Sequence, residues 1–135
     1  MPVVVVVDTN FITIPAQFAI DIFQEAESII ERKADFHIIS SVIEEIDRKI
    51  AKAKKKSEER RFRIAKSLAE KCKLIQLGDE LQGLPVDDQI IEYALSVRGV
   101  VATNDRDLRR RARSQGIPVL MLRSRKHLIL EGIIL

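Results

Sequence analysis

The strongest constraint on the fold of this chain is a run of five valines, Val3 to Val7. A strand with one face in solvent alternates apolar and polar residues, so an unbroken β-branched run predicts a strand that is buried on both faces. The run ends in a carboxylate, Asp8. Because ligands of parallel α/β sheets bind beyond the carboxyl ends of the strands, we expect Asp8 to lie at a functional site.

The remainder of the chain alternates strands with helices. Further strands are predicted at 36–39, 74–77, 99–103 and 119–122, and apolar residues with helical spacing lie between them, from about 19 to 33, from 41, over 65–72, from 87 to 98 and from 105 to 115. We expect a solvated helix end or a mobile connection at 52–57 and a loop at 78–85. This alternation predicts an α/β fold, a three-layer α/β/α sandwich with a central, mostly parallel five-stranded sheet.

The length and composition favour one globular domain, 1–135, since no linker or repeat divides the 135 residues. No apolar run approaches the roughly 20 residues of a membrane span, and the start lacks the features of a signal peptide, so we expect a cytoplasmic protein. Cys72 is the only cysteine and is interpreted as a core residue. The apolar tail, 128–135, is expected to be buried, either against the domain or in a dimer.

Acidic residues stand at the strand exits or in the first turns of the helices that follow: Asp8, Glu45, Asp87 or Asp88, and Asp105. In a parallel sheet these positions share one edge, where the carboxylates would repel one another unless a cation lay among them. Oxygen ligands, in a chain with only two histidines, favour Mg²⁺ or Mn²⁺ over zinc. The pattern indicates metal-dependent hydrolysis of phosphodiesters.

Two adjacent acids compete for one place in this set. Ser41 and Glu44 have the spacing of a capping box, in which the glutamate bonds to the backbone at the start of the helix. Because Glu44 would be engaged in this cap, we expect Glu45 to be the functional acid.

Basic residues gather around the same edge and in the middle of the chain. Arginine forks match phosphate groups, whereas the scarcity of aromatic residues, with one Tyr, five Phe and no Trp, argues against a base-stacking platform. We therefore expect binding to a nucleic-acid backbone, with selectivity for substrate shape. The RNA-binding candidates are Arg106, Arg109, Arg110, Arg113, Arg123, Lys54, Lys55 and Lys56.

Four segments resemble, in order and spacing, the four acidic motifs of PIN-domain ribonucleases. They are Asp8-Thr9-Asn10, Val42 to Ile46, Asp87 to Ile90 with Ala94 following, and Thr103 to Leu108. The resemblance covers essentially the whole chain. The segments Pro15 to Phe18 and Gly116 to Arg123, with the basic middle, look most like the archaeal and eukaryotic branch that is associated with small-subunit ribosomal RNA processing.

The resemblance implies an endoribonuclease that uses Mg²⁺ or Mn²⁺ on a structured ribosomal RNA precursor, often as a homodimer. By the motifs, Asp8 would bridge the ions, with Glu45, Asp87 and Asp105 as the other catalytic acids, Asp88 as second choice for the third acid and Asp107 as an outer ligand. The neighbouring residues that would position water or the carboxylates are Thr9, Asn10, Thr103 and Asn104.

Other interpretations stay open. An aspartate after a buried strand, such as Asp87 or Asp105, could simply cap the next helix, and Glu45 could be a solvated helix residue. The same fold and site would serve the toxin ribonuclease of a toxin-antitoxin pair, and a PIN-like RNA-binding scaffold without activity is a third possibility. A phosphoacceptor domain of receiver type is disfavoured, because Asp8 is followed by Thr9 and Asn10 rather than by an acidic partner, and because the last predicted strand runs into Arg123 instead of a lysine.

Overall fold

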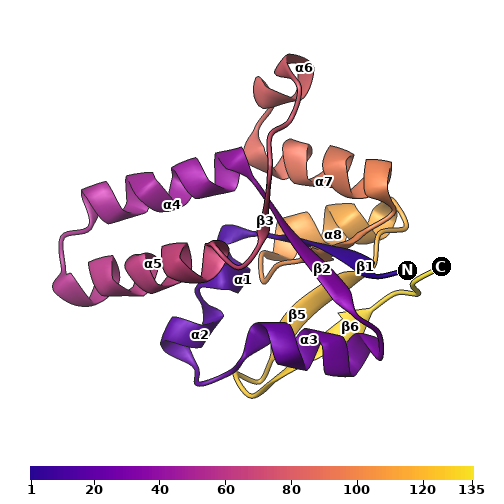
Figure 1. The fold of residues 1–135 in the computed structure, drawn as a ribbon, viewed down its shortest axis with the longest axis horizontal. Helices are drawn as coiled ribbons and strands as arrows, with labels where there is room; N and C mark the ends of the chain where they lie inside the picture. Colours follow the sequence, from indigo (N-terminus) through magenta and orange to yellow (C-terminus); the bar gives the residue numbers. More distant parts are fainter.

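In a computed structural model that describes residues 1–135, a six-stranded sheet has the order β3-β2-β1-β4-β5-β6 (Figure 1). The strands are β1 Val3–Val7, β2 Ala34–Ile39, β3 Lys73–Ile75, β4 Val100–Ala102, β5 Val119–Arg123 and β6 His127–Glu131. Neighbouring strands from β1 to β5 are parallel, and β6 is antiparallel to β5. The predicted α/β class with a mostly parallel sheet is confirmed, with six strands in place of five.

The valine run forms a central strand. β1 pairs with β2 on one side and with β4 on the other. Val5, Val6 and Val7 are completely buried. Helix α3, Ile22–Ile30, lies on one side of the sheet, while α7, Val86–Val97, and α8, Arg106–Ser114, lie on the other (Figure 1). Both faces of β1 are therefore covered, as its composition predicts.

The sixth strand settles where the apolar tail lies. Arg123 pairs with His127 across a tight turn in which Ser124 and Arg125 adopt positive φ values. The turn has no glycine, asparagine or proline, so its sequence does not mark it as a hairpin. Leu128 is buried in the domain's own core, whereas Ile133 and Leu135 beyond β6 are exposed.

Several element boundaries differ from the predictions. The predicted helix at 65–72 is α5, Lys56–Ala69, which begins in the basic segment and pairs with α4, Ser40–Lys52, as a hairpin. The helix expected from about 19 to 33 is shorter, as α3, and two short helices precede it, α1 Thr9–Ile12 and α2 Ile14–Gln17. The predicted loop at 78–85 contains α6, Asp79–Gln82. Periodicity finds the faces of helices better than their ends.

Two smaller observations complete the fold. Cys72 is a free cysteine in the hydrophobic core, as predicted. None of the helices combines the length and the apolar character that crossing a bilayer requires.

Candidate active site

Four acids from different parts of the chain line one cavity of about 270 Å³, and they are Asp8, Glu45, Asp87 and Asp105. Asp8 follows β1 and Asp105 lies shortly after β4, while Glu45 and Asp87 come from α4 and α7. After β1 the chain adds β2 and β3 on one side of β1, and it then crosses over to add β4 on the other side. The cavity thus lies at the topological switch point of the sheet, where open α/β proteins bind ligands.

Asp8 is buried, with 7% of its surface exposed. It caps α1, since its Oδ1 accepts a hydrogen bond from the Thr9 backbone N–H at 2.8 Å, and its Oδ2 accepts one from the Thr103 hydroxyl at 2.7 Å. Burial raises the pKa of Asp8 to about 6, against the lowering effect of these hydrogen bonds, and the charges of Asp87 and Glu45 raise it further. The folded protein therefore holds this negative charge at a free-energy cost.

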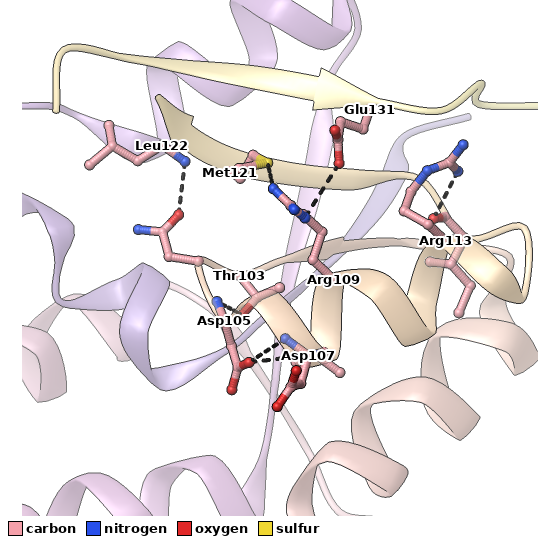
Figure 2. Close-up of polar contacts among 11 residues, drawn as sticks. Thr103, Asp105, Asp107, Arg109, Arg113, Met121, Leu122 and Glu131 are labelled. Atoms are coloured by element: carbon pink, nitrogen blue, oxygen red, sulfur yellow. Dashed lines mark hydrogen bonds and ion pairs between the residues drawn. The ribbon is translucent and has the colours of Figure 1, made fainter. Parts of the chain in front are cut away.

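A polar network joins three strand ends beneath Asp8. The Asn10 side-chain oxygen accepts from the Asn104 backbone N–H at 2.9 Å. The Asn104 side-chain oxygen accepts from the Leu122 backbone N–H at 2.8 Å, and Figure 2 shows this contact at Leu122. With the Thr103 bond to Asp8, these contacts tie the ends of β1, β4 and β5 together. Thr9 is different, because its buried hydroxyl oxygen has no hydrogen-bond partner.

Asp105 both caps a helix and lines the cavity. Its Oδ1 accepts from the backbone N–H groups of Asp107 and Leu108 at 2.8 and 3.3 Å and so caps α8, which is the simple role that an acid after a strand can have (Figure 2). It also lines the cavity, as Asp87 does. Burial raises the pKa of Asp87, the charge of Asp105 raises it further, and Arg111 opposes the shift.

The two alternative acids lie elsewhere. Asp88 forms an ion pair with Arg111 of α8 and does not line the cavity. Asp107 is exposed and is also absent from the cavity lining. Of the adjacent pair, Asp87 is the residue that faces the other acids.

The capping box that we expected at Ser41 is wrong. Helix α4 begins at Ser40 with Ile39 as its N-cap and without a side-chain cap. The Ser41 hydroxyl instead donates to the Gln89 side-chain oxygen at 2.8 Å, which joins α4 to α7. Glu44 is exposed and Glu45 lines the cavity, so the placement of Glu45 arises from the face of α4 on which it lies and not from a cap.

None of the RNA-binding candidates lines the acid cavity. On α8, Arg109 lies 3.8 Å from a Glu131 carboxylate oxygen and 3.4 Å from the Met121 sulfur, and Arg113 donates to the Ile117 carbonyl at 3.3 Å. Figure 2 shows both side chains directed toward β5 and β6, away from the Asp105 carboxyl. The other candidates are exposed and take part in no ion pair, and they are Arg106, Arg110, Arg123, Lys54, Lys55 and Lys56.

Two basic residues that the sequence analysis did not select do line the cavity, Lys49 of α4 and Arg61 of α5. The available signal was helical spacing, since Lys49 is four residues after Glu45 and therefore lies on the same face of α4. No comparable signal exists for Arg61, because its place depends on how α5 packs against α4.

The donor chemistry of the cavity suits a hard divalent cation. Carboxylates and a hydroxyl are oxygen ligands of the kind that Mg²⁺ and Mn²⁺ bind. The raised pKa values of Asp8 and Asp87 and the unpartnered Thr9 hydroxyl show that the site's polar groups are incompletely satisfied by the protein alone. The acids share the cavity without forming a group of three side chains already close enough to hold an ion.

Fold and cavity together define an α/β protein with a carboxylate-lined site at its switch point, and comparisons with known proteins identify the family. Residues 5–125 match the family described as "PIN like domain". The chain therefore belongs to the PIN domain family of nucleases. The solved structure titled as the PIN domain endonuclease Utp24 is similar with a TM-score of 0.78 and 29% identity, over 98% of this chain and 94% of that one.

Two characterised relatives are similar at the level of sequence. Ribonuclease VapC4 of Methanocaldococcus jannaschii is 30% identical over 96% of this chain and 98% of that protein. The rRNA-processing protein fcf1 of Schizosaccharomyces pombe is 30% identical over 93% of this chain, which spans 62% of that longer protein. Together with Utp24, fcf1 supports the expected ribosomal RNA processing branch.

Proposed function

We propose that the protein is a metal-dependent endoribonuclease that acts in ribosomal RNA processing. The observation that carries the proposal is the shared cavity, where Asp8 is buried beside three further acids and its pKa is raised to about 6. Such an arrangement is costly for stability and is characteristic of functional sites. The names of the relatives, an endonuclease, a ribonuclease and an rRNA-processing protein, support the choice of substrate.

Mg²⁺ or Mn²⁺ is the proposed cofactor, and Asp8, Glu45, Asp87 and Asp105 would hold it. When bound, such an ion activates water and stabilises the negative charge that develops on a phosphodiester. Asp88 and Asp107, the two further candidates, stand outside the cavity lining, and Asp88 is paired with Arg111, so the proposed ligand set does not include them.

The chain's own residues prepare the site for this chemistry. The hydrogen bonds from Thr9 and Thr103 fix both Asp8 oxygens in place, and Asn10 and Asn104 hold the two loops from which Asp8 and Asp105 extend. The cap that Asp105 forms on α8 fixes its orientation in the same way. This preorganisation reduces the cost of arranging the acids around a cation and a phosphate.

The proposed partner is a structured ribosomal RNA precursor. The expectation of a homodimer and of a cytoplasmic location is part of the proposal and has the family resemblance as its support. The exposed tail residues Ile133 and Leu135 are apolar, which is consistent with a covered surface at this end of the chain.

Incubation of the purified protein with a structured ribosomal RNA precursor and Mn²⁺ tests the proposal. We expect discrete cleavage products with the wild type and none with Asp8→Asn. A matched control is Asp79→Asn on α6, an exposed aspartate outside the cavity, which should cleave normally. Cleavage that persists in Asp8→Asn or in excess EDTA would contradict the proposal, and RNA binding without any cleavage would favour the inactive scaffold.

A toxin ribonuclease is the second candidate, because the similarity to ribonuclease VapC4 extends over nearly the full length of both chains. The two functions differ in their cellular effect. Depletion of a processing enzyme causes unprocessed ribosomal RNA to accumulate, whereas production of a toxin alone arrests growth until a partner protein restores it. Growth arrest that depends on Asp8 would decide for the toxin.

A further inference from the structure

Two basic side chains, Lys49 and Arg61, stand in the wall of the acid cavity. Lys49 lies one helical turn beyond Glu45 on α4, and Arg61 precedes Phe62, a buried residue of α5 that also lines the cavity. Figure 1 shows α4 and α5 side by side, running away from the carboxyl ends of the strands. The two charges therefore enter the cavity from the two helices of this hairpin.

Neither side chain is used in an ion pair. The ion pairs of the protein join Arg63 to Glu59, Lys66 to Asp47, Arg109 to Glu131 and Arg111 to Asp88. Lys49 and Arg61 thus have no carboxylate within 4.0 Å, although four acids line the same cavity. Unlike Arg109 and Arg111 of α8, which lie beside Glu131 and Asp88, they are available to an anionic ligand.

The cavity continues into two neighbouring hollows through these same residues. Lys49, together with Arg48, Lys52 and the two acids Glu45 and Glu58, lines one hollow between α4 and the start of α5. Arg61, together with Lys56 and Arg60, lines another between α5 and α2. Lys49 and Arg61 each line the acid cavity and one neighbouring hollow in which basic residues outnumber acidic ones, so each stands where a phosphate of a nucleic-acid strand could enter or leave the cavity.

We propose that Lys49 and Arg61 bind the substrate phosphates on the two sides of the scissile bond, so that the RNA strand crosses the acid cavity along the α4–α5 hairpin. This inference rests on the proposed nuclease function and names the path of its substrate. Without these two cations the only charged groups in the cavity lining would be the four carboxylates, which repel phosphates. A guanidinium fork and a flexible ammonium are the groups that bind phosphates at such a place.

The test measures RNA binding separately from cleavage. Lys49→Gln and Arg61→Gln are compared with the wild type in EDTA by fluorescence anisotropy with a labelled oligouridylate over a series of salt concentrations. We expect each substitution to weaken binding about tenfold at low salt. Each should also lower the slope of log K against log[salt] by about 0.7, the value for one lost contact to a single-stranded phosphate.

The matched control is Arg63→Gln, which removes a charge from an exposed residue of α5 that lines none of the three hollows. It should leave the affinity and the slope unchanged. Arg61→Lys, which keeps the charge but loses the fork, should recover the slope and only part of the affinity. Urea unfolding of every variant confirms that the fold is intact.

A purely structural role predicts a different result. If Lys49 and Arg61 only neutralise the acids, the glutamine variants will unfold at lower urea concentration while RNA binding and its salt slope stay at the wild-type values, and the proposal is overturned. It is also overturned if the wild type does not bind the probe at low salt, or if Arg63→Gln lowers the slope as much as Arg61→Gln. Failure of the wild type to cleave RNA would refute the nuclease function, whereas the binding measurements would still show whether Lys49 and Arg61 contact RNA phosphates.

Discussion

Replacement of Asp8 by asparagine should stabilise the metal-free protein at neutral pH. The pKa of Asp8 is raised from its ordinary value of 3.8 to about 6, chiefly by burial. A difference of about two pKa units corresponds to about 3 kcal/mol of free energy that the folded state spends to ionise this carboxyl. The asparagine amide can donate to Thr103 in place of accepting from it, at a cost of about 1 kcal/mol. We therefore expect a net gain of about 2 kcal/mol.

The pH dependence identifies the cause of this gain. Because the folded pKa lies above the unfolded one, the protonated carboxyl contributes stability that is fully present below about pH 4 and is lost as the pH rises through about 6. Asp8→Asn should thus be about 2 kcal/mol more stable than the wild type at about pH 7.5, whereas at about pH 4, where the ionisation cost has vanished, the exchanged hydrogen bond should leave it less stable by up to about 1 kcal/mol. Urea unfolding in EDTA, followed by circular dichroism, measures both values.

The reasoning is refuted if Asp8→Asn is less stable than the wild type by the same amount at both pH values. That result would mean that the hydrogen bonds from Thr9 and Thr103 make Asp8 a structural residue. The matched control, Asp79→Asn, removes an exposed carboxylate and should change stability by less than about 0.5 kcal/mol at either pH.

Other substitutions probe the remaining parts of the site. Glu45→Gln should abolish RNA cleavage in the precursor assay, whereas Glu44→Ala, on an exposed position without a capping role, should leave cleavage intact and change the free energy of unfolding by less than about 0.5 kcal/mol. Asn104→Ala removes the acceptor that joins the end of β4 to β5, and should destabilise the protein by about 1 kcal/mol in urea unfolding. Arg111→Met removes the charge that opposes the shift of Asp87, so the pKa of Asp87, followed by NMR, should rise further; a fall would contradict this assignment.

The sequence predicted the parts of the fold that depend on burial patterns alone. Five valines could only form a central strand, and residues that follow parallel strands must share an edge, which is why Asp8 and Asp105 were found in one cavity. The capping-box argument for Glu45 was wrong, since Ser41 bonds to Gln89 across a helix interface that a local motif does not contain, and the family motif remains as the sequence argument for this residue.

The parts that were missed depend on contacts between distant segments. Arg109 and Arg113 follow a strand exit and carry the right charge for RNA, but β6 brings Glu131 beside Arg109, and β6 itself follows a turn without turn residues. Arg61 lines the cavity because α5 packs on α4, whereas its sequence context is only a basic stretch. Charge in a sequence indicates a ligand class, and the packing decides which charges remain available for it.

Calorimetric titration of the protein with Mn²⁺ tests most directly the claim that these carboxylates serve a divalent cation. Binding should be saturable, and at about pH 6 it should release protons, because a cation displaces the proton that the raised pKa of Asp8 retains. Asp8→Asn should lose both the binding heat and the proton release. The absence of saturable binding in the wild type, or unchanged binding in Asp8→Asn, would contradict the account.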